Sequence, residues 1–546
     1  MYISSIPENA EFDFVVVGSG SAGCVVANRL TADGRHSVLL LEAGGRDNHY
    51  MLRIPALVAQ VLNDTRWTWP YLTEPQTQLN GEKRKWPRGR VIGGCSSING
   101  NLFVRGDPVE YDSWRDELGC KGWGYSDLLP VFKRLEDFPE GDPVLRGSGG
   151  PIHCTRLDNF DALSEAFLGA CGEAGFPRVG DYNDGHYEGA FNLQYTTRRG
   201  LRNSAAVGYL RPVQKRPNLT ILPNATVTRV LMNGRQATGV EFRAGDVTRQ
   251  VRARREVVLS AGPLASPQLL ELSGIGNSEI LQKHGIPVLH HLPGVGENLR
   301  DHPYVRLSFE CAQALTINDV LRNPLLRMKE GLRFIFRREG ILSISSSTAQ
   351  MNYRSRPDAK QAELVLRFMP LSGKDRYAKD SKYGLDPFPG FSFGVAVLQP
   401  RSSGFAHIQS SDPTQQAAMD PRYFSHESDA QMFLEGVRVA RRVVRMPALK
   451  PFFVREIRPG PEAGDDASLL EYMRNTVTTS WHMVGTCKMG VDASAVVDPE
   501  LRVRGITSLR VIDSSICPTI PASNTNIPAI AVGEKGADLL LAAANA

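Results

Sequence analysis

The chain has 546 residues, more than a single hydrophobic core supports, so we expect two or three domains. Hydrophobic residues make up 42%, charged residues 22% and the net charge is +5, as in ordinary globular proteins. Lysine and arginine are dispersed, without a basic run among aromatics, which excludes a nucleic-acid-binding groove. No apolar stretch approaches about 20 residues, so we expect no integral membrane segment.

The cysteines and histidines indicate a compartment and exclude a class of site. The N-terminus lacks the basic start and apolar core of a signal peptide. The eight cysteines have no C-x-x-C spacing, which favours free thiols in a reducing compartment over disulfides. The eleven histidines form no metal-ligand pattern. These features predict a cytoplasmic protein without a metal site.

Residues 11–43 predict a strand, a glycine-rich turn, a helix and a second strand. The apolar run 14–17 is the first strand, 22–30 the helix and 38–41 the second strand. The turn reads G-x-G-x-x-G, from Gly18 to Gly23. This order of elements is the opening of a nucleotide-binding fold.

Each glycine of the turn has a physical task. Gly18 permits the tight turn, Gly20 lets the backbone approach a pyrophosphate, and Gly23 allows close contact between helix and strand. Glu42 ends the second strand, where a carboxylate would bind ribose hydroxyls. A tight loop without a ligand is the alternative for such a motif alone. The combination predicts dinucleotide binding, without separating FAD from NAD.

Two further segments are rich in small residues. Residues 89–100 (GRVIGGCSSING) suit close approach of backbone to a flat ligand, although a mobile surface loop is the alternative. Residues 260–276 predict a strand end, a turn, a short helix and another glycine turn. With the predicted strands 218–222, 227–232, 237–242, 257–260 and 509–513, they indicate a nucleotide domain assembled from three separated pieces.

Two C-terminal segments complete the set of motifs. Residues 480–490 read SWHMVGTCKMG, and residues 511–515 lead through a proline-rich turn to a last helix at about 528–541. Together with 89–100, 260–276 and 293–302, these motifs resemble the glucose–methanol–choline (GMC) family of FAD oxidoreductases. The resemblance extends from Asp13 to Leu540. The chain is similar to bacterial choline-dehydrogenase-like members and to aryl- and furfuryl-alcohol oxidases.

The resemblance implies both the fold and the cofactor. It selects FAD over NAD, and it implies an α/β fold: a discontinuous Rossmann-like FAD-binding domain with a second α+β substrate domain on an antiparallel sheet. The implied FAD domain comprises residues 11–154, 200–304 and 495–546. The implied substrate domain comprises residues 155–199 and 305–494.

Site residues follow from the same resemblance. The histidine of H-x-x-G-T, which accepts the alcohol proton, falls on His482, and its partner position falls on Asn524. An isolated histidine is more often structural, but an imidazole near its ordinary pKa of about 6.5 suits a base at neutral pH. The implied FAD contacts are Gly18, Gly20, Ser21, Ala22, Gly23, Glu42, Ala43, Trp69, Arg90, Gly93, Gly94, Ser97, Asn99, Gly100, Asn101, Leu102, Val227, Ala261, Trp481, Asp513, Thr525 and Asn526.

The last helix has a role of its own. Pro528 fits its first turn, where a missing N–H has no cost. In the family the positive N-terminal end of this helix faces the flavin, which becomes anionic on reduction, so the helix dipole would stabilise that charge. Asn526 serves as an N-cap, a ligand or both.

Two departures from family patterns bear on the cofactor and the substrate. Ile98 stands where some members attach FAD covalently through histidine, so we expect noncovalent FAD. Tyr304 stands shortly after Asp301-His302, where choline-specific members carry a glutamate, so a choline substrate is disfavoured. Trp481 and the aromatics Phe391 and Phe393 favour an apolar or aromatic alcohol, with core packing as the alternative.

The expected reaction is oxidation of a primary alcohol, aromatic or furanic, to the aldehyde. His482 would take the hydroxyl proton, the flavin the hydride, and O₂ or another acceptor the electrons. Whether the enzyme is an oxidase or a dehydrogenase stays open. The alternative is an FAD-containing hydroxynitrile lyase or another non-redox member of the same family.

Overall fold

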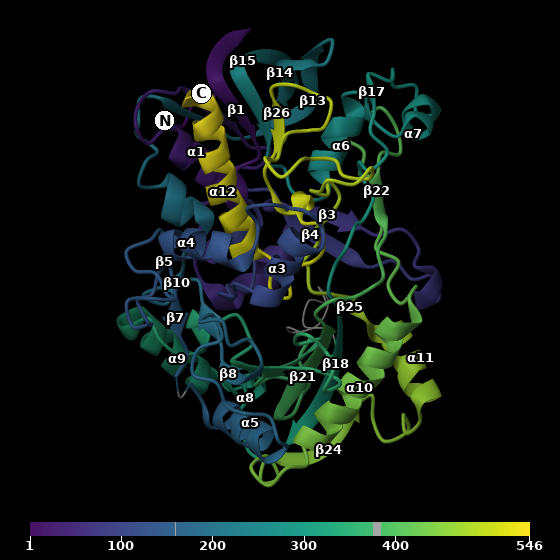
Figure 1. The fold of residues 1–546 in the computed structure, drawn as a ribbon. Helices are drawn as coiled ribbons and strands as arrows, with labels where there is room; N and C mark the ends of the chain where they lie inside the picture. The colour runs from purple at the N-terminus through teal and green to yellow at the C-terminus, as the bar shows by residue number, and fades with distance from the viewer. Residues whose placement is uncertain (159, 375–383, 546) are drawn as a thin grey trace.

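The computed structural model describes residues 1–158, 160–374 and 384–545. The described residues build two seven-stranded sheets. Figure 1 shows one sheet at the end of the molecule that holds both termini and the other at the opposite end. The arrangement confirms the expected α/β class with an antiparallel second sheet.

The first sheet is mixed. Its strand order is β12 (Leu219–Leu222), β2 (Val38–Leu41), β1 (Ala10–Val17), β15 (Val247–Leu259), β14 (Gln236–Ala244) and β13 (Ala225–Asn233), with β26 (Leu509–Val511) beside β15. The first four and β26 run parallel, whereas β13–β14 and β14–β15 are antiparallel pairs. The predicted strands 14–17 and 38–41 are therefore confirmed as the centre of the sheet. They are continuous apolar runs because both faces of a parallel sheet are covered.

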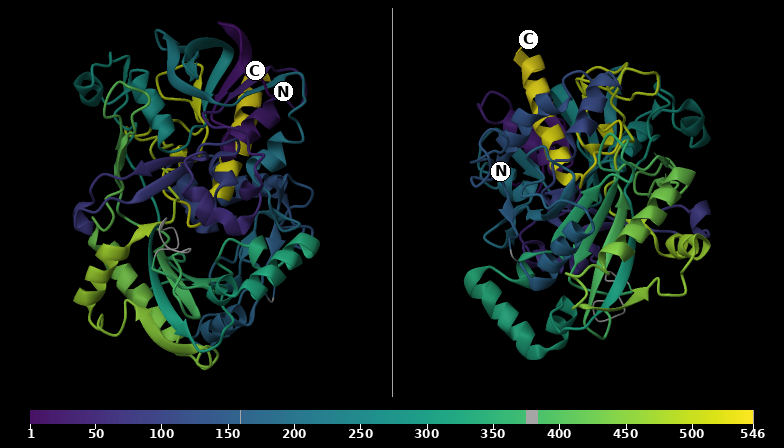
Figure 2. Two further views of the ribbon diagram at one scale, coloured as in Figure 1. Left: turned by 180° about the vertical axis from the view of Figure 1, so that it is seen from behind. Right: turned by 60° about the horizontal axis from the view of Figure 1, so that its bottom comes forward.

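Two helices cover this sheet near the glycine-rich turn. Helix α1 (Ser21–Leu30) follows the turn, and α12 (Asn526–Asn545) packs along it, as the two views of Figure 2 show. A Cβ on Gly533 of α12 would lie 2.9 Å from Cα of Ala22, so the two backbones approach closely. The buried carboxylate of Glu534 accepts a hydrogen bond from the guanidinium of Arg29 at 2.6 Å and ties α12 to α1.

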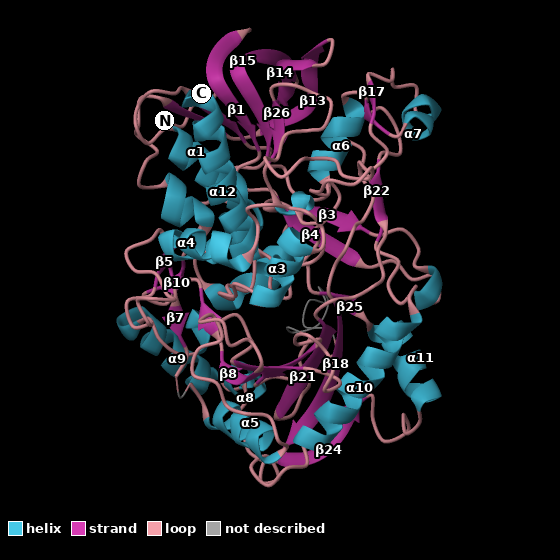
Figure 3. Cartoon of the chain, in the orientation of Figure 1, coloured by secondary structure: helices cyan, strands magenta, loops and turns pink. Residues whose placement is uncertain are grey.

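The second sheet is antiparallel and lies across the molecule from the first (Figure 3). Its order is β24 (Phe453–Arg458), β18 (Pro303–Cys311), β21 (Gly390–Val397), β20 (Leu364–Met369), β19 (Ala349–Tyr353) and β8 (Gly189–Asn192), with β25 (Thr478–Thr479) beside β18. Helix α10 (Glu427–Val443) packs on β20 and β21.

The aromatics Phe391 and Phe393 belong to the core of this half. Both are fully buried on β21 and pack with Phe167 of α5 (Ala162–Glu173), Phe309 and Phe368. Neither is among the described residues that line the cavity between the two sheets. The suggestion that they point to an aromatic substrate is therefore wrong, and core packing explains them.

The division of the chain into two domains stays a prediction. β8 joins the second sheet, in keeping with residues 155–199 belonging to the substrate domain. Val484, Cys487 and Met489, however, pack in the hydrophobic core of the first sheet. We therefore propose that the last FAD-domain segment begins nearer 484 than 495. Within the described ranges, no helix is long and apolar enough to cross a membrane.

Candidate active site

A cavity of about 950 Å³ lies between the two sheets, within the size range of cofactor and ligand sites. The predicted cofactor residues line it, with the exception of Gly23, Gly93 and Ser97. His482 and Asn524 line it as well. Segments as far apart in the sequence as Ser21 and Asn526, 505 positions, thus meet at one place, as the motifs implied.

The three exceptions lie behind the wall and shape it. A Cβ on Gly23 would lie 1.9 Å from the carbonyl oxygen of Gly18, so only glycine permits this contact of helix and turn. The Gly93 amide donates to the carbonyl of Ser19 at 2.8 Å, with φ at +93°, a value that favours glycine. The Ser97 hydroxyl donates to the carbonyl of Ile92 at 2.9 Å. These residues position the lining and do not face the cavity.

One end of the cavity is built to receive an anion. Helix α1 begins after Gly20, which provides no side-chain cap, so its first amide groups are available to phosphate. Ser21 Oγ donates to Asn526 Oδ1 at 2.8 Å and joins the N-terminal ends of α1 and α12. A Cβ on Gly94 would lie 2.7 Å from Cα of Gly20, which shows how closely the two glycine-rich segments approach.

Glu42 lies beside this anion-binding end at the carboxyl edge of the first sheet. Its Oε2 accepts from the amide and the hydroxyl of Ser19 at 3.0 and 2.7 Å, and its Oε1 from the amide of Gly44 at 2.8 Å. Burial raises the pKa of this carboxyl, and the hydrogen bonds counteract that effect. Its Oε1 retains a lone pair for a ribose hydroxyl.

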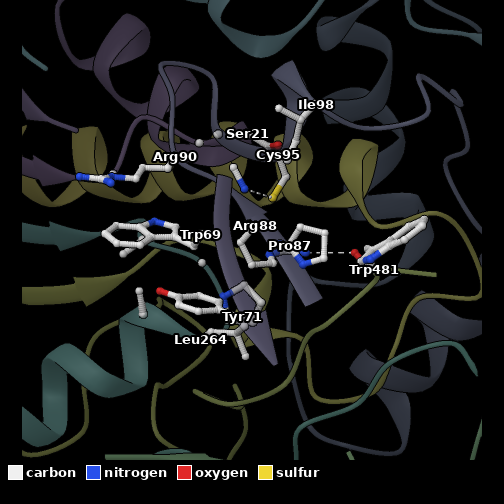
Figure 4. A pocket seen from close by; sticks show the side chains of 18 of the residues that line it. Ser21, Trp69, Tyr71, Pro87, Arg88, Arg90, Cys95, Ile98, Leu264 and Trp481 are labelled. Carbon is white, nitrogen blue, oxygen red and sulfur yellow. Dashed lines mark hydrogen bonds between the residues drawn. The ribbon is translucent and has the colours of Figure 1, made fainter. Parts of the chain in front are cut away.

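The nearby walls are aromatic and flat. Trp69 and Tyr71 of β3 (Thr68–Leu72) stack with centroids 6.0 Å apart, and the Arg90 guanidinium lies 4.5 Å above the Trp69 ring (Figure 4). Asn101 Oδ1 is buried in the cavity wall with no hydrogen-bond partner in the described part of the chain. A volume of this size, the uncapped N-terminal end of α1, a carboxylate and an open acceptor fit FAD.

The two predicted catalytic residues are in direct contact. Asn524 Nδ2 lies 2.9 Å from Nε2 of His482. Asp301 fixes His482 from behind, since its Oδ1 accepts the His482 amide at 2.7 Å and its Oδ2 accepts the hydroxyls of Thr479 and Tyr423. Burial raises the pKa of Asp301 to about 6.

A histidine that the sequence reasoning did not assign to the site determines the tautomer of His482. His302 Nε2 lies 2.8 Å from the carbonyl oxygen of Leu398, which only accepts, so His302 carries its proton on Nε2. Burial lowers the pKa of His302 to about 4, so its Nδ1 is an acceptor. His302 Nδ1 and His482 Nδ1 are 2.9 Å apart, so His482 is protonated on Nδ1. The lone pair of His482 is therefore on Nε2, beside Asn524.

The expectation of an ordinary imidazole pKa for His482 is wrong. Burial lowers the pKa of His482 well below 6.5, and His302, Arg367 and Arg88 act in the same direction. The imidazole is half-buried in the cavity wall, near two guanidinium groups that disfavour a positive charge on it. His482 is therefore neutral, and ready to accept a proton, across the neutral pH range.

Arginines that carried no sequence signal also line the cavity. Arg367 of β20 donates from Nη2 to Oδ1 of Asn524 at 3.2 Å and from Nε to Oε1 of Gln350 at 2.8 Å. Arg306 of β18 lines the same wall. An arginine in a strand without a surrounding motif looks like a surface residue, so only the pairing of β18, β21 and β20 reveals its position.

The chain matches one family over most of its length. Residues 12–304 and residues 400–533 each match the family described as GMC oxidoreductase. The oxygen-dependent choline dehydrogenase of Photobacterium profundum is 39% identical over 537 residues, 98% of this chain and 93% of the relative. That of Vibrio vulnificus is 38% identical over 534 residues, 97% of this chain and 94% of the relative.

Solved structures show the same fold. Pyridoxine 4-oxidase from Mesorbium loti has a TM-score of 0.87 at 29% identity, covering 96% of this chain and 98% of that chain. Formate oxidase from Aspergillus oryzae RIB40 has a TM-score of 0.92 at 27% identity, covering 99% and 100%. The similarity therefore includes both sheets.

Proposed function

Because the chain belongs to the GMC oxidoreductase family, and is thus an FAD-dependent enzyme acting on CH–OH donors, we propose that it oxidises a primary alcohol, aromatic or furanic, to the aldehyde. The observation that carries the proposal is the hydrogen-bonded series from Leu398 through His302 and His482 to Asn524. It places the Nε2 lone pair of His482 in the cavity wall, where in the absence of substrate it accepts a hydrogen bond from Nδ2 of Asn524.

The residues of the site then have separate tasks. His482 Nε2 takes the hydroxyl proton of the alcohol, since the other nitrogen already carries a hydrogen. The alcohol hydroxyl replaces the hydrogen bond between the two side chains: it donates to His482 Nε2 and accepts from Nδ2 of Asn524, whose Oδ1 is held by Arg367. FAD held by the residues of the first sheet's wall would supply the acceptor for the hydride of the carbinol carbon. His302 holds the base in the required tautomer and touches no substrate.

The cavity disfavours choline, although relatives that are 38–39% identical are named choline dehydrogenases. Among the described residues that line the cavity, the only carboxylates are Glu42 and Asp513. Asp513 is occupied by the amides of Gly262 and Ser515 and the hydroxyl of Ser266. No carboxylate of the described cavity wall is left to hold a quaternary ammonium group.

FAD is proposed to bind without a covalent bond, because Ile98 stands at the cavity wall where a linking histidine would be needed. Denaturation of the purified protein by acid or heat should release yellow FAD into the supernatant. Flavin that stays on the precipitated chain would refute this. The predicted cofactor residues, the anion-binding helix ends and Glu42 are proposed to hold the released molecule.

A reducing compartment fits the thiols. All eight cysteines lie in described ranges and none is paired, and seven of them are buried. We propose a cytoplasmic protein whose electrons pass to O₂ or to another acceptor.

Anaerobic mixing with a panel of alcohols tests the function. Benzylic and furanic primary alcohols should bleach the flavin absorbance within the mixing experiment, and choline should do so at least about tenfold more slowly. Admission of air then separates the acceptors, because a rapid return of colour identifies an oxidase. Failure of every alcohol to bleach the flavin would contradict the proposal and favour a non-redox member of the family.

A further inference from the structure

The cavity wall formed by the second sheet carries two arginines in one row. Tyr304 and Arg306 on β18, and Arg367 on β20, flank the central strand β21. Arg306 and Arg367 are both in register with Gly394 of β21. Side chains of paired residues point to the same face of a sheet, so both guanidinium groups face the cavity that they line.

A tyrosine ring lies between the two arginines. A Cβ on Gly394 would lie 2.0 Å from the Tyr304 hydroxyl and 2.2 Å from ring atoms, so the ring crosses the sheet over this glycine. The Tyr304 hydroxyl donates to Met369 Sδ at 3.4 Å, and the Arg306 guanidinium carbon is 6.0 Å from the Tyr304 ring centroid. The wall is therefore an aromatic surface with a cation on each side.

Neither arginine has a counter-ion in the described part of the chain. The two hydrogen bonds of Arg367 go to the neutral side chains of Asn524 and Gln350 and leave its Nη1 without a partner there. The buried Nε of Arg306 has no hydrogen-bond partner within the described ranges. Arg88, whose Nη1 donates to the carbonyl of Trp481 at 3.1 Å, adds a third guanidinium without an ion pair among the described residues.

Arg306 and Arg367 are half-buried, and a part-buried cation without a counter-ion favours an anion beside it. An anion bound there would lie near the reacting atoms, since Arg367 contacts Asn524, and Asn524 contacts His482. Guanidinium groups bind carboxylates in a planar, two-pronged geometry. Glu42 and Asp513, the carboxylates of the described wall, are hydrogen-bonded to the loops of the first sheet.

We propose that Arg306 and Arg367 form a subsite for a carboxylate on the alcohol substrate, so that the enzyme prefers a hydroxymethyl carboxylic acid in which an aromatic ring separates the two groups. The inference rests on the proposed function and names its substrate class. In the reaction the carbinol carbon loses a hydride to FAD and the hydroxyl loses its proton to His482. The carboxylate is unchanged and leaves with the aldehyde.

A matched series of para-substituted benzyl alcohols tests the subsite with the FAD-loaded enzyme. The series comprises 4-(hydroxymethyl)benzoate, its neutral methyl ester and the cationic 4-(trimethylammonio)benzyl alcohol. Because hydrogen bonds between charged groups are strong, we expect kcat/KM to be about 10- to 100-fold higher for the carboxylate than for the ester. The cationic alcohol should have the lowest kcat/KM. An ester or cation that is oxidised as well as the carboxylate would overturn the proposal.

Variants of the two arginines test whether these side chains cause the preference for the carboxylate. Arg306→Gln and Arg367→Gln should each reduce the carboxylate-to-ester ratio of kcat/KM to below about threefold, while Arg367→Lys retains part of it. Arg455→Gln, on the same sheet and paired with Glu310 outside the cavity, is the control and should keep the wild-type ratio. If Arg367 only held Asn524 in place, Arg367→Gln would slow both alcohols equally, and that result would also overturn the proposal.

Binding separates this proposal from the proposed function. Calorimetry should show that benzoate binds at least about tenfold more tightly than benzamide, and that Arg306→Gln abolishes the difference. This measurement needs no turnover, so it decides on the subsite even if no alcohol bleaches the flavin. Conversely, oxidation of neutral alcohols without any preference for the anion would leave the proposed function standing and refute the subsite.

Discussion

The two walls of the cavity differ in the kind of residue that forms them. The wall beside the first sheet contains glycine-rich segments whose backbones approach closely at Gly20 and Gly94. The wall on the second sheet carries large side chains, such as Tyr304, Arg306 and Arg367. Backbone surfaces tolerate few changes and bind what is common to all dinucleotides. Side-chain surfaces can change without altering the fold, so we propose that the second sheet determines substrate choice.

The base at the junction of the two walls should give the largest effect. Replacing His482 with alanine should slow anaerobic flavin reduction by about 10²- to 10⁴-fold, because no other group takes the hydroxyl proton. Stopped-flow absorbance measures the rate, and the flavin spectrum should stay intact. His186→Ala, an exposed histidine, is the control. A rate near that of the wild type would place the base elsewhere.

The pH dependence of flavin reduction in the unmodified enzyme also tests His482 as the base. Burial lowers the pKa of His482 well below 6.5, so the neutral base predominates throughout the neutral range. The rate of flavin reduction should therefore show no loss between about pH 8 and pH 6.5, and fall only at more acidic pH. A fall centred at about 6.5 would indicate an exposed, ordinary imidazole.

One added methyl group on each wall tests the comparison directly. In Gly23→Ala the Cβ would lie 1.9 Å from a backbone oxygen, which cannot move aside, so we expect about 3 kcal/mol of destabilisation and loss of bound FAD. In Gly394→Ala the Cβ displaces the Tyr304 ring, so FAD should be retained while alcohol preference changes. Flavin-to-protein ratio and kcat/KM across the alcohol panel measure the two. Equal loss of FAD in both variants would contradict the division of roles.

A smaller effect is expected from the orienting amide. Asn524→Ala removes one hydrogen bond to a developing charge, a loss of about 1.5–3 kcal/mol, or about 10- to 100-fold in the rate of flavin reduction. FAD content should not change. Purification of Asn524→Ala without flavin would instead make Asn524 a residue of the cofactor site.

The smallest expected effect concerns stability. His407 lies between Glu271 at 2.7 Å and Glu297 at 3.0 Å, and although burial opposes it, these carboxylates raise the pKa of His407 to about 9. A raised pKa stabilises the fold below about pH 6.5 and loses that contribution as pH rises through about 9. Because Glu297 is half exposed, we expect only about 1 kcal/mol. Thermal unfolding at about pH 6 and pH 9.5 should show a fall in Tm that is absent in His407→Gln, and an equal fall in both would exclude this ion triad.

Much of the part of the molecule around the first sheet could be predicted, because the sequence patterns that specify it are local. The strand 14–17, the turn at Gly18 and the helix that follows are contiguous in the chain, and the structure has β1, the turn and α1 there. The last helix, predicted at 528–541, is α12 from Asn526 to Asn545. Hydrophobic periodicity and glycine spacing suffice where the ligand contacts are backbone groups.

The catalytic pair and the second sheet could be predicted from the sequence only in part. The motif around His482 and Asn524 carried their positions, and the structure brings the two side chains to 2.9 Å. The motif predicted neither the tautomer of His482 nor its lowered pKa, because both depend on burial and on His302. Phe391 and Phe393 were misassigned because an apolar strand residue looks the same whether it faces the core or a cavity.

By itself the sequence determined the family, the glycine-rich turn between β1 and α1, and the choice of His482 as the proposed base, because these depend on contiguous patterns with fixed spacing. The tertiary structure decided that Arg306 and Arg367, 61 positions apart, both lie level with Gly394. It also decided that a tyrosine lies between them and that no described carboxylate neutralises them. Strand register brings such residues together, and register depends on pairing between distant segments, which no local pattern of residues encodes.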